Sequence, residues 1–114
     1  MKTLLLALLF TTALAQTAAK PETVMVTCHA NAGAATELQR VLERHWRTIS
    51  DLKLVTADPH VRLKGVDAGG TAVFVEIFTW RDSAIPDHAP DAVQSIWSDL
   101  NKLARVEISE VERW

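Results

Sequence analysis

The sequence predicts an α+β fold, in which an antiparallel four-stranded sheet carries two helices on one of its faces. Three observations lead to this prediction. Segments with strand-like alternation and segments with helical periodicity follow one another in the order β-α-β-β-α-β. Two of the strands are joined by a short glycine-rich loop, which is typical of an antiparallel hairpin. No repeat, low-complexity tract or linker divides the chain, so we expect a single domain over residues 22–114.

The first half of this domain contains a strand, a helix and a loop. Apolar residues on both faces of an alternating pattern predict a strand over 22–30. After a turn at 31–33, apolar side chains recur every three or four residues, which predicts an amphipathic helix over 34–50. The stretch 51–59 contains the short apolar run LKLV but ends in Asp58-Pro59, and we interpret it as a loop.

The second half contains a hairpin, an irregular segment, a helix and a strand. Strict alternation predicts a strand over 60–66, and β-branched and aromatic residues predict another over 71–80. The segment SAIPDHAP is irregular. Pro90 is well placed as the first residue of a helix whose apolar stripe runs to Ala104 and which ends at Arg105. The segment VEISEV predicts a last strand over 106–111.

This order of elements is that of the ferredoxin-like split β-α-β fold, which leaves one sheet face without helices. The strand 71–80 carries large apolar side chains on both of its faces. An extended apolar face in water is unfavourable, so we expect a homodimer in which two sheets stack into a barrel.

The first fifteen residues have the pattern of a secretory signal peptide. Lys2 precedes an apolar run from Leu4 to Phe10, and Ala13 and Ala15 have the spacing of a cleavage site. The run is far shorter than the ~20 residues of a membrane span. We therefore expect cleavage after Ala15 and a secreted or periplasmic mature protein without a membrane anchor.

Charge and cysteine content exclude several classes of partner and fold. The chain has 12 Lys and Arg against 14 Asp and Glu, a net charge of −2, so it has no basic stripe for nucleic acid or an anionic membrane surface. Its one cysteine, Cys28, excludes an intramolecular disulfide framework and a Cys-based zinc ribbon. We expect this cysteine to be buried.

The segment VFVEIFTWRDSAIPDHAPDAVQSIW, together with the order of elements, resembles the antibiotic biosynthesis monooxygenase family of dimeric α/β barrels. The resemblance covers about 24–111. The matching features are a strand that ends in Phe78, Thr79 and Trp80, a turn at Arg81 and Asp82, His88 before the second helix, the apolar helix around 93–100, and Gly33 before the first helix. The family includes cofactor-independent quinone-forming monooxygenases, heme-degrading oxygenases and small proteins of unknown role.

The resemblance implies roles for two residues. Trp80 matches a tryptophan that lies beside the pocket in family members, although a strand-end aromatic also suits core packing. His88 matches the heme ligand of the heme-degrading branch. That branch also has an asparagine on its first strand, where this chain has Thr27, Cys28 and His29. This difference argues against heme degradation.

Glu76 is the candidate general base. It lies in the middle of a strand expected to be central, where an unpaired carboxylate is costly. Such a carboxylate can remove a proton from an aromatic substrate. The alternative is a structural ion pair across the hairpin, because Arg62 and Lys64 have the parity to lie on the same face.

The histidines allow a further alternative. His29 and His60 lie on strand faces that could meet Glu76, which would give a His/His/Glu metal site. Because no single element shows the spacing of metal ligands, we predict no metal. We interpret His45 as a packed histidine on the buried stripe of the first helix. Of the four tryptophans, two are expected against the sheet or at the dimer interface: Trp46 and Trp97.

Two classes of function remain. The first is an exported, cofactor-independent monooxygenase that acts on aromatic or quinol-like substrates, with no cofactor predicted. The second is a non-catalytic module that binds a small ligand or has a structural role. A buried polar relay in a pocket would favour the enzyme, whereas an Arg62–Glu76 pair in a filled barrel would favour the module. The candidate catalytic residues are Glu76 and His88, and the candidate substrate-binding residues are Trp80, Phe74, Phe78, His29 and Arg62.

Overall fold

The structure is a computed structural model that describes residues 19–58 and 60–114. The predicted signal peptide, residues 1–15, lies outside the described residues. The elements follow in the order β1 (Glu22–Ala30), α2 (Ala35–Asp51), β2 (Val61–Val66), β3 (Ala72–Trp80), the 3-10 helix η1 (Ile85–His88), α3 (Asp91–Leu103) and β4 (Ala104–Glu110). The predicted α+β class and the order β-α-β-β-α-β are confirmed.

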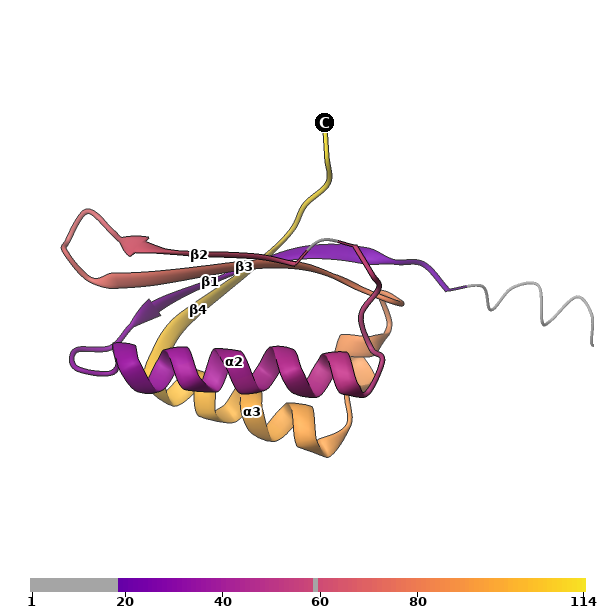
Figure 1. Ribbon diagram of the computed structural model, residues 1–114, viewed down its shortest axis with the longest axis horizontal. Helices are drawn as coiled ribbons and strands as arrows, with labels where there is room; N and C mark the ends of the chain where they lie inside the picture. Colours follow the sequence, from indigo (N-terminus) through magenta and orange to yellow (C-terminus); the bar gives the residue numbers. More distant parts are fainter. Residues whose placement is uncertain (1–18, 59) are drawn as a thin grey trace, which may run out of the picture.

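The strands form one antiparallel sheet in the order β2-β3-β1-β4, and α2 and α3 cover the same face of it (Figure 1). We call this the helix face and the other the open face. Two central strands, β1 and β3, pair over their full lengths, with Val26 opposite Glu76. The ferredoxin-like topology therefore places Glu76 near the middle of the sheet, under the helices.

The core lies between the sheet and the helices. Its strand residues alternate with the pleat, and its helix residues recur every three or four positions, as the sequence pattern predicts. The larger buried side chains of these elements are Val24, Val26, Cys28, Phe74, Phe78 and Trp80 from the strands, Leu38, Val41 and Ile49 from α2, and Val93, Ile96 and Leu100 from α3. Within the described residues, no helix is both long and apolar enough to cross a membrane.

The end of the second helix differs from the prediction. Helix α3 ends at Leu103, and Ala104 is already extended, pairs with Ala30 and is buried in the core. Arg105 pairs with His29 in the same ladder. The apolar pattern could not separate these elements, because the last turn of the helix and the first strand residue face the same core.

Three smaller differences concern the loops. Pro90 precedes α3 as its N-cap, so Asp91 is the first helical residue. The irregular segment before it contains a turn of 3-10 helix, η1. In the predicted loop after α2, a single bridge joins Val55 to Trp80.

The open face carries an apolar area next to a polar cluster. The strand register places Val61 and Leu63 of β2 beside Ile77 and Val75 of β3, and Leu63 is 59% exposed. Toward β4, His29 bonds to two carboxylates, one from the hairpin loop and one from the last strand: Asp67 and Glu107.

Candidate functional site

Two cavities lie between the sheet and the helices, and Glu76 lines both of them. One has a volume of about 370 Å³ and lies beside α3; its wall includes Phe78, Trp80 and Trp97. We call it the aromatic cavity. The other has a volume of about 300 Å³ and lies beside β2. Val26 and Leu42 also line both, so the two cavities are neighbours on the helix face of the sheet.

Glu76 is buried, with only 4% of its surface exposed, and one of its oxygens is held by a histidine. His60 Nε2 lies 2.6 Å from Glu76 Oε2, so in the carboxylate form of Glu76 the imidazole N–H donates to this oxygen. Trp46 stacks on the His60 ring with 3.5 Å between ring centroids. The stacking fixes the imidazole plane, and Glu76 Oε2 is thereby held in place.

The second oxygen of Glu76 faces a histidine from α2. His45 occupies the position on the buried stripe between Val41 and Ile49, and its Nδ1 lies 3.8 Å from Glu76 Oε1. This distance is too long for a direct hydrogen bond. The other ring nitrogen, Nε2, lies 2.9 Å from Trp97 Nε1 on α3. Helix packing thus brings a tryptophan, a histidine and a carboxylate into one row.

Aromatic rings form the remaining wall of the aromatic cavity. Phe78 meets Trp80 edge to face at a centroid distance of 5.0 Å, and Trp80 meets Trp97 in the same manner at 6.3 Å. Such edge-to-face pairs are favourable and hold the rings in defined orientations. The cavity therefore offers flat apolar walls together with a few polar side chains, which suits a small aromatic ligand.

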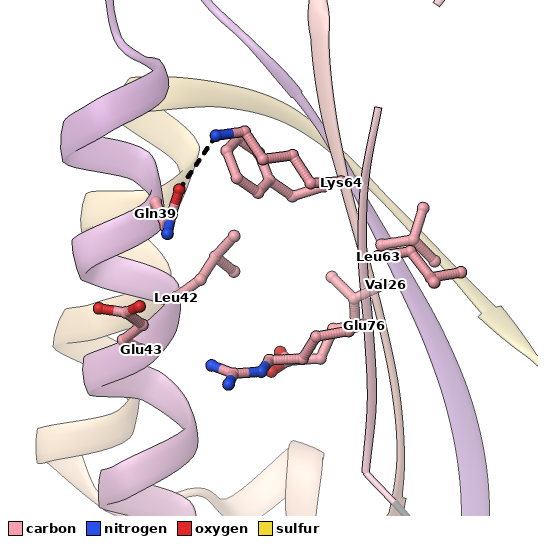
Figure 2. Close-up of a pocket in the computed structure, with 10 residues that line it drawn as sticks. Val26, Gln39, Leu42, Glu43, Leu63, Lys64 and Glu76 are labelled. Atoms are coloured by element: carbon pink, nitrogen blue, oxygen red, sulfur yellow. Dashed lines mark hydrogen bonds between the residues drawn. The ribbon is translucent and has the colours of Figure 1, made fainter. Parts of the chain in front are cut away.

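The cavity beside β2 is more polar. Figure 2 shows Gln39 and Leu42 of α2 facing the strands, with Lys64 bonded to the Gln39 side chain at 3.3 Å. Lys64 Nζ also lies 5.4 Å from the centre of the Phe74 ring. Arg62 lines this cavity as well, on an edge strand whose residues are all exposed.

A buried thiol lies close to the carboxylate. Cys28 is 1% exposed, as expected from the sequence, and pairs with Phe74 in the strand register. Burial raises the pKa of Cys28 to about 11, and the negative charge of Glu76 contributes to the rise. A thiol with this pKa is protonated at neutral pH, which disfavours nucleophilic attack.

The structure brings together part of the predicted site. Glu76, Phe78 and Trp80 line the aromatic cavity, while Phe74 and Arg62 line the neighbouring one with Glu76. In the described part of the chain, the ion pairs of Glu76 are to His60 and His45. The alternative of a pair with Arg62 or Lys64 is therefore wrong, although Arg62 is the β2 residue directly opposite Glu76 in register.

Two predicted site residues lie elsewhere. His29 pairs with Val73 on the open face, opposite to the side on which Glu76 lies, so the expectation that it meets Glu76 is wrong. Its ring nitrogens instead bond to Asp67 and Glu107.

Over residues 19–58 and 60–114, no three His, Cys, Asp or Glu side chains are arranged to hold a metal ion.

His88 is the second of these residues. It is exposed at the end of η1 and is not among the residues that line either cavity. Pro86, two residues before it, lines the aromatic cavity. The residues therefore do not fit a heme ligated by His88.

The expectation that His60 lies on a face that meets Glu76 is confirmed by the 2.6 Å contact between them. The contributions of His45 and Trp97 are not predicted by the sequence. His45 is the one titratable side chain on an otherwise apolar helix stripe, and this is the signal that could identify it. Trp97 acts through a contact between two helices, which no local pattern predicts.

Comparison with known proteins identifies the fold. No family model matches the chain, and no curated protein matches it. Among solved structures, SnoaB, a cofactor-independent oxygenase from Streptomyces nogalater, is 18% identical with a TM-score of 0.62, over 83% of this chain and 95% of its own. A conserved protein of unknown function from Bacteroides thetaiotaomicron is 10% identical with a TM-score of 0.66, over 84% and 100%.

A third solved structure is described as an antibiotic biosynthesis monooxygenase. It is 15% identical to this chain, with a TM-score of 0.61, over 83% of this chain and 99% of its own. At these identities the comparison concerns the fold alone. The chain has the ferredoxin-like fold of the antibiotic biosynthesis monooxygenase-like proteins.

Proposed function

We propose that the chain is a cofactor-independent monooxygenase for small aromatic or quinol-like substrates, with Glu76 as the general base. The observation that carries this proposal is a buried carboxylate that lines an aromatic cavity, with one oxygen held by His60 and the other without a hydrogen-bond partner among the described residues. SnoaB, which has the same fold, is a cofactor-independent oxygenase, and this supports the assignment.

The proposed reaction needs only a base, a dry pocket and O₂. Glu76 removes a proton from the bound substrate, and the resulting anion passes one electron to O₂. The substrate radical and superoxide combine at a carbon that bears hydrogen and form a peroxide anion, which takes up the proton held by Glu76 and becomes a hydroperoxide. Loss of water from the hydroperoxide leaves a carbonyl group, so one atom of O₂ enters the product and the other leaves as water.

The alternative of a filled, non-catalytic module has less support. That alternative relied on an ion pair between Glu76 and Arg62, and the partners of Glu76 are histidines instead. The row of buried polar groups from Trp97 through His45 to Glu76 supports the enzyme.

Substitution of Glu76 by Gln tests the proposal. The amide keeps the shape of the side chain but cannot accept a proton, so oxygen uptake with a panel of quinols should fall to the uncatalysed rate. Glu37→Gln, the same change on the exposed side of α2, is the matched control and should leave uptake unchanged. If Glu76 is purely structural, its replacement should instead lower the free energy of unfolding by about 3 kcal/mol and the wild type should consume no oxygen.

We also propose that the protein is exported and acts as a homodimer. Export is inferred from the amino-terminal pattern, and sequencing of the mature protein should find Gln16 as its first residue. Met1 on protein retained in the cytoplasm would contradict it. Dimerisation is inferred from the apolar residues on the open face, of which Val61 and Leu63 are exposed.

A further inference from the structure

Two buried polar atoms face each other without a hydrogen bond. His45 Nδ1 and Glu76 Oε1 are 3.8 Å apart, on side chains that are 4% and 5% exposed. Within the described residues, neither atom has a hydrogen-bond partner. Both residues line the aromatic cavity. Leaving a buried donor or acceptor unpaired is unfavourable, so the pair is suited to a ligand atom that satisfies both.

Trp97 determines which of the two atoms is the donor. The indole N–H can only donate, so His45 Nε2, at 2.9 Å, must be its acceptor. A neutral imidazole that accepts at Nε2 carries its proton on Nδ1. His45 Nδ1 is therefore a donor, and it faces the free oxygen of a carboxylate, which is an acceptor.

A hydroxyl group matches this arrangement. Two atoms 3.8 Å apart can both lie about 2.8 Å from one oxygen placed between and to one side of them. That oxygen must accept from His45 Nδ1–H and donate to Glu76 Oε1. A hydroxyl does both, whereas a carbonyl or an ether only accepts and an ammonium only donates.

We propose that His45 Nδ1 and Glu76 Oε1 form a two-point site for a phenolic hydroxyl, in which Trp97 is the positioning residue that fixes the His45 tautomer. The aromatic walls formed by Phe78 and Trp80 favour a phenol over an alkyl alcohol. This inference rests on the proposed function, because it names the group on which the Glu76 base acts.

The site has a chemical consequence. When the phenol proton moves to Glu76 Oε1, the negative charge stays on the phenol oxygen, and His45 Nδ1–H already donates to that atom. A donor fixed in advance stabilises a developing oxyanion more than a mobile one. Because Trp97 occupies Nε2, the imidazole cannot present its lone pair to the substrate in place of its N–H.

The first experiment uses para-nitrophenol, whose phenolate absorbs visible light, and nitrobenzene, which has the same ring without the hydroxyl. With the full chain, para-nitrophenol should bind roughly tenfold or more tightly than nitrobenzene, and its bound form should show phenolate absorption. Equal affinity of the two compounds would overturn the proposal.

Variants of His45 separate hydrogen bonding from packing. His45→Asn keeps an N–H near the position of Nδ1 and should retain the preference for para-nitrophenol, whereas His45→Leu should abolish it. Equal preference in both variants would contradict the proposal.

Trp97→Phe keeps an aromatic ring but removes the indole donor, so ¹⁵N NMR should show one His45 tautomer in the wild type and a mixture in this variant. A mixture already present in the wild type would also overturn the assignment.

The hydroxyl site and the monooxygenase activity can fail independently in these measurements. A preference for para-nitrophenol without oxygen uptake by any quinol would support the hydroxyl site and reject the monooxygenase. Oxygen uptake that survives His45→Leu at the wild-type rate, with no preference for the phenol, would reject the hydroxyl site and retain the monooxygenase.

Discussion

His60 Nε2 lies 2.6 Å from Glu76 Oε2, although His60 precedes β2 and Glu76 has a cationic side chain, Arg62, opposite it in register. The imidazole reaches the carboxylate because it is stacked against Trp46 on α2. The buried carboxylate is thus held by an imidazole and not by the nearby arginine.

The first prediction concerns this contact. His60→Ala leaves Glu76 Oε2 buried without a donor, so the free energy of unfolding should fall by about 3 kcal/mol in urea denaturation. Arg62→Ala, at the register partner of Glu76, is the control and should cost under about 1 kcal/mol because its strand is exposed. Equal losses in the two variants would show that Arg62 supports Glu76 as much as His60 does.

The second prediction concerns the proposed dimer. Val73 lies on the open face and Phe74 on the helix face, where it is 7% exposed. Val73→Asp should leave the circular dichroism spectrum unchanged and convert a dimer into a monomer in sedimentation velocity runs. Phe74→Asp should instead prevent folding, because it places a charge in the core. A wild-type chain that sediments as a monomer at micromolar concentration would refute the dimer.

The third prediction concerns acid stability. A hydrogen bond from the backbone N–H of Thr71, with a smaller contribution from His29, lowers the pKa of Asp67 below its usual 3.8. A hydrogen bond from His29, with a smaller contribution from the charge of Arg105, lowers the pKa of Glu107 below its usual 4.5. Carboxylates with a folded-state pKa below the unfolded value stabilise the protein above the unfolded pKa. That contribution disappears as the pH falls through the folded pKa.

Asp67→Asn tests this relation. The amide oxygen can still accept from the Thr71 and Gly69 N–H groups, but the charge is lost. In urea denaturation the difference in stability between wild type and variant should therefore be present at about pH 6 and shrink as the pH falls below about 4. A difference that does not change over this range would mean that the charge of Asp67 has no part in stability.

The fourth prediction concerns Cys28. Because burial raises the pKa of this thiol to about 11, the thiolate is scarce at neutral and mildly alkaline pH. A thiol reagent should therefore label the folded protein slowly at pH 8 and label the urea-unfolded protein rapidly. Rapid labelling of the folded chain would indicate that β1 opens readily.

The sequence by itself determined the order of the elements and the class of fold, because the two periods of hydrophobicity and the glycine-rich hairpin loop are local properties. It also identified Glu76, Phe78 and Trp80 as residues of one strand face. It could not determine which face of β1 lies on the same side of the sheet as Glu76. That strand is apolar on both faces, and a shift of one residue in its pairing with β3 would turn each of its side chains to the other side of the sheet.

The tertiary structure decided the partners of Glu76. His45, His60 and Glu76 come from a helix, a strand entry and a central strand, and their atoms meet only once the helix packs on the sheet. Trp97 then reaches His45 from the other helix. Contacts of this kind depend on strand register and helix packing over many residues, whereas a sequence pattern specifies only the face on which each side chain lies.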